Sequence, residues 1–331
     1  MSPTKTSNKA KIDPNYGLPI DPTRRLSVVL FIEVVFSNPN GNPDTGNAPF
    51  MLPDGRGRIS NACIKRIARD YWGARGRELF RARGGVMEDL MSGQTPKQLL
   101  SRFWDLRLFG GILTHALSEE GGRNIDKRAV GCFQLSDAFS IDPIHFVPWA
   151  GTGVSVYKAE AKPAKPAKGK AKKKDEEAVE ADAEAVSDKD AKEGETGNFF
   201  NRDVVEFGLY RAAAQLNPFS AGQNGLTEQD LADFWEGLIE GWDYKRSSVR
   251  MGVNLRRIIV FEHPDTRGSE QGAWLDKRVV VTSPYDGHNV PASIEEYDIS
   301  LNLEGLAPGV RVFQWADGVG SEITQAPVAA K

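Results

Sequence analysis

The chain has 331 residues, of which 40% are hydrophobic, with a mean hydropathy of −0.42 and a formal net charge of −3. This composition is typical of a globular protein with a sizeable core, in one large domain or two small ones. Because no apolar run approaches the roughly 18 residues of a membrane span and residues 1–25 lack a signal peptide's apolar core, we expect a cytoplasmic protein with no membrane partner.

The charges are unevenly distributed along the chain. Much of the acid lies in residues 178–195, whereas residues 56–83 are strongly basic and contain few acids. The basic residues of that segment are Arg56, Arg58, Lys65, Arg66, Arg69, Arg75, Arg77, Arg81 and Arg83. The net acidity alone would argue against phosphate binding, but its distribution leaves a segment that suits nucleic acid.

The first predicted elements are a strand, a loop and a helix. Residues 26–36 (LSVVLFIEVVF) predict a buried strand, because β-branched and aromatic residues dominate the run. Residues 37–58 are rich in Asn, Pro, Gly and Asp and predict a long ordered loop. A helix is then expected to begin at Ser60 or Asn61, with one apolar and one cationic face.

The later elements alternate between helices and strands. Residues 95–104 predict a helical region, and paired glycines within residues 105–113 predict a sharp turn or a close backbone approach. A second helix is expected over residues 227–242, with Thr227 and Asp230 in a capping-box-like pattern. Further strands are expected at 129–139, 255–261, 277–282 and 297–303. This alternation around a sheet indicates an α+β fold.

A charged insert interrupts the second half of the chain. Residues 158–198 change from a Lys/Ala/Pro run to a Glu/Asp/Ala run with almost nothing to bury, which predicts disorder. Short β-patterns at 153–157 and 203–207 flank it and indicate a hairpin with a long tip. The predicted parts are an N-terminal arm (1–25), a first body segment (26–157), the insert (158–198), a second body segment (199–310) and a C-terminal tail (311–331).

Signals for catalysis are weak in this sequence. Its four histidines are scattered, and there is no phosphate-binding Gly-Lys-Ser/Thr loop and no nucleophile elbow. Cys63 and Cys132 have no companion at metal-ligand spacing and are interpreted as core residues. Asp44 and Asp105 are able to hold Mg²⁺, but an Asx turn at Asp44 and a cap or an ion pair with Arg107 at Asp105 explain them more simply.

The Asn-rich loop is a candidate binding surface. Asn38, Asn40, Asn42 and Asn47 offer amide donors, while glycines allow a backbone to come close. The cationic helix face that follows would add fixed charge for successive phosphates. A plain surface loop beside a solvated helix face is the alternative, and composition leaves both open.

The residues then show a family likeness. FSNPNGNPDTGNAP and NACIKRIARDYW resemble the N-terminal signature of the Cas-seven family, the crRNA-binding backbone subunit of the CRISPR type I Cascade complex, most closely type I-C. DLRLFGGIL, FSIDPI, EFGLYRAAAQLNPFSAGQNGLTEQDLADFWEGL and RSSVRMGVNLRRIIVFEH resemble later family segments in the same order. Two positions depart from the usual loop, with Asn42 where Asp is familiar and Phe50 where Arg is frequent.

The resemblance implies a palm with an RNA-recognition-motif (ferredoxin-like) fold, helical finger elements and a β-hairpin thumb. Such subunits form a head-to-tail filament along the spacer part of the crRNA and support recognition of target DNA in antiviral defence. The implied partners are crRNA, target DNA through the guide, copies of the chain itself, and the large, small and crRNA-processing Cascade subunits. It implies no cofactor, no metal and no enzymatic activity.

Carried onto this chain, the resemblance gives candidate RNA contacts. They are Asn38, Asn40, Gly41, Asn42, Arg58, Lys65, Arg66, Arg69, Arg107 and Arg250, with Phe199 or Phe200 as the thumb wedge that unstacks a base. The insert is expected to be a tolerated loop, or to add weak RNA affinity through its basic half. Alternative functions are a type III-like metal-dependent RNA endonuclease that uses Asp44, and a stand-alone RNA-binding protein of another pathway.

Overall fold

The computed structural model describes residues 16–117, 127–156 and 197–323. One compact unit, here called the main unit, is made of residues 1–147 and 204–331, and a second, the hairpin unit, is made of residues 148–203. Most of the predicted N-terminal arm and of the predicted insert lie outside the described residues. Among the described helices, none has both the length and the apolar character needed to cross a membrane.

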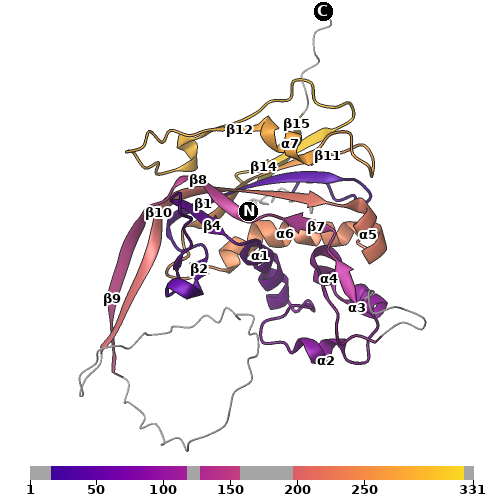
Figure 1. The fold of residues 1–331 in the computed structure, drawn as a ribbon, viewed down its shortest axis with the longest axis horizontal. Helices are drawn as coiled ribbons and strands as arrows, with labels where there is room; N and C mark the ends of the chain where they lie inside the picture. The colour runs from indigo at the N-terminus through magenta and orange to yellow at the C-terminus, as the bar shows by residue number, and fades with distance from the viewer. Residues whose placement is uncertain (1–15, 118–126, 157–196, 324–331) are drawn as a thin grey trace, which may run out of the picture. The chain divides into compact units, whose positions relative to one another are not determined.

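A large antiparallel sheet forms the centre of the main unit (Figure 1). Its order is β15 (Val319–Ile323), β14 (Arg311–Ala316), β11 (Val253–Glu262), β1 (Leu26–Ser37), β10 (Gly197–Leu216), β8 (Ala138–Pro143) and β4 (Arg56–Ile59). Two more strands, β7 (Phe133–Leu135) and β9 (Phe146–Val156), also pair with β10. The predicted combination of helices with a sheet is confirmed.

Strand β1 lies in the middle of this sheet. Leu30 is opposite Ala212 of β10 on one side and Ile258 of β11 on the other. Because neighbours on both sides satisfy its backbone, every residue from Leu26 to Val34 is buried, as the continuous apolar run predicts.

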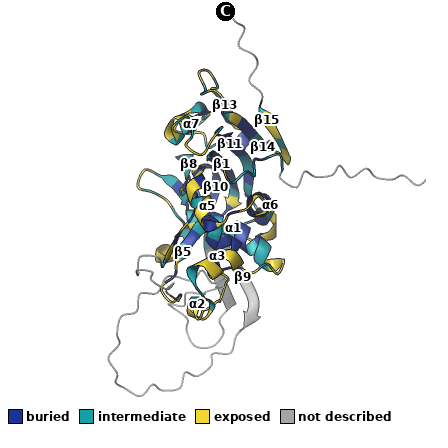
Figure 2. Ribbon diagram, turned by 90° about the vertical axis from the view of Figure 1, so that its right-hand side faces the viewer, coloured by how far each residue is buried: buried dark blue, intermediate teal, exposed yellow. Residues whose placement is uncertain are grey.

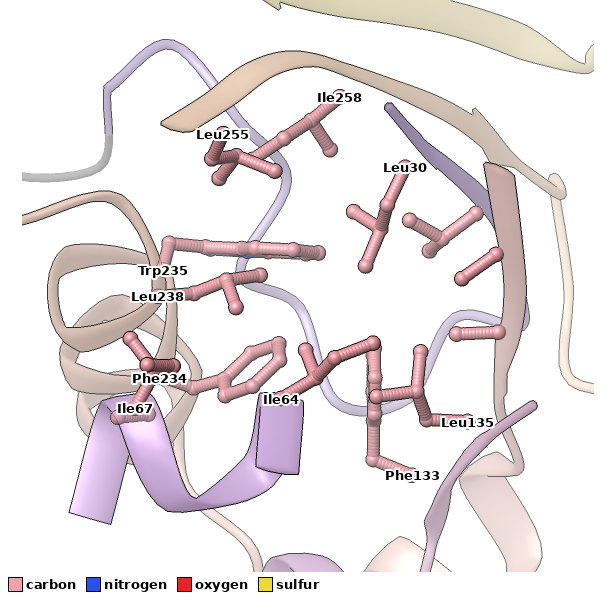
Figure 3. Packing of buried hydrophobic residues seen from close by; sticks show 14 of the residues in the cluster. Leu30, Ile64, Ile67, Phe133, Leu135, Phe234, Trp235, Leu238, Leu255 and Ile258 are labelled. Carbon is pink, nitrogen blue, oxygen red and sulfur yellow. The ribbon is translucent and has the colours of Figure 1, made fainter. Parts of the chain in front are cut away.

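Two long helices cover one face of the sheet. Helix α1 (Asn61–Ala74) begins after Ser60, whose side chain accepts a hydrogen bond from the Cys63 N–H, and helix α6 (Glu228–Tyr244) has the predicted Thr227 capping box. Their apolar stripes meet the sheet in one core, which contains Ile64, Ile67, Phe234, Trp235, Leu238, Leu30, Phe133, Leu135, Leu255 and Ile258 (Figure 3). Buried positions accordingly concentrate in the sheet and in the helix faces turned toward it (Figure 2).

A smaller layer lies on the opposite face of the sheet (Figure 1). It consists of α7 (Gly272–Arg278), β12 (Val279–Thr282), η3 (Ile294–Glu296) and β13 (Asp298–Leu301). Leu275 of α7 packs in this second core with Phe31 of β1 and Phe261 of β11. The central strands are therefore buried on both faces, which explains why they lack alternation of polar and apolar residues.

Short elements complete the main unit. They are α2 (Met87–Met91), α3 (Pro96–Arg102), α4 (Trp104–Phe109), β5 (Gly110–Ile112), β6 (Arg128–Val130) and α5 (Pro218–Asn224). Gly110 has φ +73°, and a Cβ there would lie 2.3 Å from the Gly131 nitrogen. The close backbone approach predicted for the paired glycines is confirmed.

The structure corrects both predicted ends of the chain. Residues 311–323 of the predicted tail form β14 and β15, since Val312 and Phe313 pack into the two cores on either face of the sheet. Within the predicted arm, residues 16–25 lie on the main unit, where the Pro19 carbonyl accepts from the Trp235 indole at 2.9 Å. The residues near either end of the chain form only short local patterns, and these did not predict the packing of β14 or the hydrogen bond between Trp235 and Pro19.

Strands β9 and β10 form the hairpin that the sequence predicts, and both are longer than the expected patterns. Residues 208–215, which follow the second of these patterns, lie entirely within β10. The tip of the hairpin, residues 157–196, lies outside the described residues.

Candidate nucleic-acid interface

The predicted Asn-rich loop folds back on itself through its own side chains. It contains β2 (Gly41–Asn42), η1 (Pro43–Thr45) and β3 (Ala48–Pro49), with β2 paired to β3. The Asn38 side-chain amide donates to the Asn47 carbonyl at 2.6 Å, and the Asn40 side-chain oxygen accepts from the Ser60 N–H at 2.8 Å. Asn38 and Asn40 are buried. We therefore revise their predicted role from RNA contact to holding the loop on the start of α1.

The remaining loop predictions are also revised by local geometry. The Asn42 side chain accepts from the Asp44 N–H at 3.1 Å and caps η1, so the Asx turn belongs to Asn42 and not to Asp44. A Cβ on Gly41 would lie 2.9 Å from the Asn47 carbonyl oxygen, so this glycine is needed to close the loop rather than to admit a ligand. The tip, residues 43–47, is exposed and presents the Asp44 carboxylate to solvent.

Arg58 lies at the base of the loop, where its N–H donates to the Phe50 carbonyl. Its guanidinium pairs with Asp137 at 2.6 Å and lies 4.8 Å from the centre of the Phe50 ring. Asp137 also accepts from Asn61; burial opposes ionisation, but these hydrogen bonds lower the pKa of the Asp137 carboxyl below its usual value. Arg58 keeps 34% of its side chain exposed, so it is oriented and still reaches the surface.

Arg69, a predicted RNA contact, is buried in an ion pair within the main unit. Its Nε donates to Asp105 at 2.9 Å, and Asp105 also accepts from the backbone N–H groups of Phe80 and Arg81. Arg69 is 6% exposed and Asp105 is 0% exposed. The pair is a buried tie between α1, the segment after it and α4, and it also replaces the predicted Asp105–Arg107 pair.

Lys65 and Arg66 stay at the surface of α1, both partly buried. Lys65 lies over the Phe109 ring at 5.6 Å, and burial, together with the charges of Arg69 and Arg81, lowers the pKa of Lys65. Arg66 donates to the Arg81 carbonyl at 2.8 Å and lies 3.5 Å from Asp70. These two cations are accessible but already in contact with their own unit.

Arg107, another predicted RNA contact, is also held in an ion pair with little exposed surface. It forms a two-pronged ion pair with Asp230 at 2.8 and 2.7 Å and donates to the Leu100 carbonyl. Its side chain is only 12% exposed. This pair joins α4 to the capping box of α6, so Arg107 holds α4 on the core helix.

Arg250 has a different environment. It lies in the turn before β11, and among the described residues no carboxylate pairs with its side chain. The preceding residue, Val249, accepts through its carbonyl from the Asn38 N–H at 2.7 Å, which places this turn against the start of the Asn-rich loop. Arg58 and Arg250 therefore lie beside the loop, whereas Arg69 and Arg107 lie largely in the interior of the main unit.

Two further predictions concern the hairpin and metal binding. Phe199 and Phe200, the predicted wedge, lie in β10, but their side chains are outside the described residues. Within the described ranges, no group of three or more His, Cys, Asp or Glu side chains is placed to hold a metal ion.

Sequence reasoning missed two exposed apolar side chains beside the loop, Phe36 at the end of β1 and Met251 in the turn before β11. Phe36 ends an apolar run and was therefore interpreted as part of a buried strand. Its positive φ has no signal in the residue type, because bulky aromatic residues rarely adopt it.

The family model described as CRISPR-associated protein Cas7 matches residues 24–302. Among solved structures, the chain is similar to a chain of a "CRISPR RNA-guided surveillance complex, pre-nicking". The two are 14% identical, the match covers 72% of this chain and 78% of that chain, and the TM-score is 0.43. A second, of a "CRISPR RNA-guided surveillance complex", shows 14% identity over 72% and 68%, with a TM-score of 0.38. No curated protein matches the chain.

Proposed function

Because the chain belongs to the Cas7 family of CRISPR-associated proteins, we propose that it is a backbone subunit of a type I Cascade complex that binds the spacer part of the guide crRNA. The family match across residues 24–302 carries this proposal. The subunit holds the guide while base pairing reads the target DNA in antiviral defence. The subtype proposed from the sequence motifs is I-C, and the setting is the cytoplasm.

The strand order supports an RNA-recognition-motif (ferredoxin-like) palm. Taking β1, β8, β10 and β11 as the four strands, the order in the sheet is β11-β1-β10-β8, with α1 after the first strand and α6 after the third. This order matches the βαββαβ arrangement expected of that fold, and α1 and α6 pack in the same core. The short elements α2 to α4 serve as fingers, and the β9–β10 hairpin serves as the thumb with Phe199 or Phe200 as its wedge.

The proposed guide contacts are reduced to the cations that reach the surface. Arg58 and Arg250 border the loop, and Lys65 and Arg66 lie on α1. Each acts on the backbone of the RNA, because a phosphate contact carries no sequence information. Copies of the chain stack head to tail along the guide, and the large, small and crRNA-processing subunits complete the complex.

The salt dependence of guide binding tests these contacts. The variant Arg58→Ala, Arg66→Ala, Arg250→Ala removes three proposed contacts, and Lys97→Ala, Arg267→Ala, Lys277→Ala is the matched control, since these side chains are exposed and change the net charge equally. Each lost phosphate contact reduces the slope of log K against log salt by about 0.7 for a single strand. The first variant is expected to lose about 2 units of slope and the control none; equal losses would contradict the assignment.

We also propose that the chain itself does not cleave RNA. Asp44 is the residue to test, because its exposed carboxylate matches the alternative of a metal-dependent endonuclease. Assembled complex is incubated with complementary RNA and Mg²⁺, with Asp44→Asn as the matched variant. Intact RNA supports a scaffold, whereas cleavage at regular intervals that Asp44→Asn abolishes would establish the nuclease.

A further inference from the structure

Phe36 has an unusual backbone for an aromatic residue in a central strand. Its φ is +41°, a left-handed value that L-residues with bulky side chains rarely adopt. It still belongs to β1, between Val35, which pairs with Phe207, and Ser37, which pairs with Val205. Strain of this kind persists only where the surroundings hold it, and it is frequent at ligand-binding positions.

The consequence of this conformation is that the ring is exposed. Phe36 is 50% exposed, although the nine residues from Leu26 to Val34 are all buried. An apolar ring in water contributes nothing to the core, so packing of the ring does not account for the strained backbone. The residue presents an aromatic surface outward at the point where the strand enters the Asn-rich loop.

Met251 lies beside Phe36 on the neighbouring chain segment. The Val35 N–H donates to the Gly252 carbonyl at 2.9 Å, and the Asn38 N–H donates to the Val249 carbonyl at 2.7 Å. These two bonds bracket Phe36 on one side and residues 250–251 on the other. Met251 is 61% exposed, so an aromatic ring and a flexible thioether side chain occupy adjacent surface positions.

The charges around this pair indicate what it binds. Arg250 adjoins Met251 and has no carboxylate partner among the described residues, unlike Arg246 in the same turn, which pairs with Asp243. On the other flank, Glu206 of β10 lies between the partners of Val35 and Ser37 in the register. A polyanion is therefore attracted along the Arg250 side and repelled from the β10 side.

We propose that Phe36 and Met251 form a stacking platform for one nucleobase of single-stranded RNA, with Arg250 binding the adjacent phosphate. This rests on the proposed function and names the residues that contact a base on the main unit. Aromatic side chains stack bases of any identity, which suits a subunit that holds guides of different sequence. The flanking Arg and Glu orient the RNA backbone toward the β11 side of the platform.

Phe36→Gly separates binding from folding. Glycine adopts φ +41° without strain, so the variant keeps its unfolding midpoint or raises it, while it loses the ring. Loss of one stacked base is expected to weaken binding of a labelled oligouridine by about 5- to 150-fold, measured by fluorescence anisotropy on the full chain. Phe36→Tyr keeps a stacking surface and is expected to retain affinity within about 2-fold.

The matched control is Trp274→Ala, which removes an exposed aromatic side chain from α7 and is expected to leave affinity unchanged. If the unaltered chain fails to bind RNA, the proposed function fails and the platform with it. If it binds and Phe36→Gly binds equally well, only the platform is overturned. A large loss of stability in Phe36→Gly, or loss of self-assembly at unchanged RNA affinity, would assign the ring to folding or to a protein contact and overturn it too.

Discussion

The buried pair of Arg69 and Asp105 gives the sharpest prediction about how the basic helix is used. Asp105→Ala removes the acceptor of one guanidinium bond at 2.9 Å and of two backbone bonds, from Phe80 at 2.8 Å and Arg81 at 3.3 Å. Removing one partner of a fully buried pair costs about 3–5 kcal/mol, a large share of the roughly 5–15 kcal/mol that holds a typical domain. We expect Asp105→Ala to lose that amount of unfolding free energy.

Arg69→Met gives a graded comparison. The carboxylate of Asp105 keeps its two backbone donors, and the Met side chain fills the space of the arginine stem, so we expect a smaller loss of about 1–3 kcal/mol. Urea denaturation at constant m-value measures both losses, with Arg250→Ala as a control expected within about 0.5 kcal/mol of the unaltered chain. RNA affinity of folded Arg69→Met should be unchanged. An unchanged stability together with weakened RNA binding would refute the reasoning and restore Arg69 as a phosphate contact.

Three further predictions test the frame around the interface. Asp230→Ala leaves the Arg107 guanidinium buried without its carboxylate and removes the α6 capping box. Calorimetry should therefore show an unfolding free energy lower by about 3–5 kcal/mol, and a decrease of under about 1 kcal/mol would contradict the role of the pair. Gly57→Ala places a Cβ 2.2 Å from the buried Tyr210 hydroxyl and overpacks this site. Urea denaturation should show an unfolding free energy lower by about 1–3 kcal/mol. The pKa of Asp137 is lowered in the folded state, so its contribution is present above its ordinary pKa of 3.8 and lost as pH falls through the lowered value. The difference in unfolding free energy between the unaltered chain and Asp137→Asn should therefore shrink below pH 3.8. A difference that grows below this pH would contradict a lowered pKa of Asp137.

Local patterns predicted the central elements well. The apolar run at residues 26–36 is β1, and the Thr227 capping box begins α6 where its residue types indicate. Each signal lies within a few neighbouring residues, because strand burial and helix capping are decided by the side chains at hand. The paired glycines also gave a local signal for the close approach at Gly110, although the backbone that approaches it belongs to Ala129 and Gly131.

The structural roles of Arg69 and Arg107 could not be predicted from neighbouring residues in the same way. Arg69 and Arg107 stand in basic or family-like segments, yet their acidic partners are 36 and 123 residues away in the chain. Only the packing of α1, α4 and α6 brings these groups together, and burial then decides that they stabilise the fold. Phe36 shows the converse case, since its apolar type predicts a buried side chain and its backbone conformation turns it outward.

The copy number of the chain on guides of different length tests the central claim most directly. The chain is co-expressed with its partner subunits and with guides of graded spacer length, and the purified complexes are weighed by native mass spectrometry while the bound RNA is sequenced. A backbone subunit predicts bound crRNA and a copy number that rises in regular steps with spacer length. Complexes without guide RNA, or with the same copy number at every spacer length, would contradict the account.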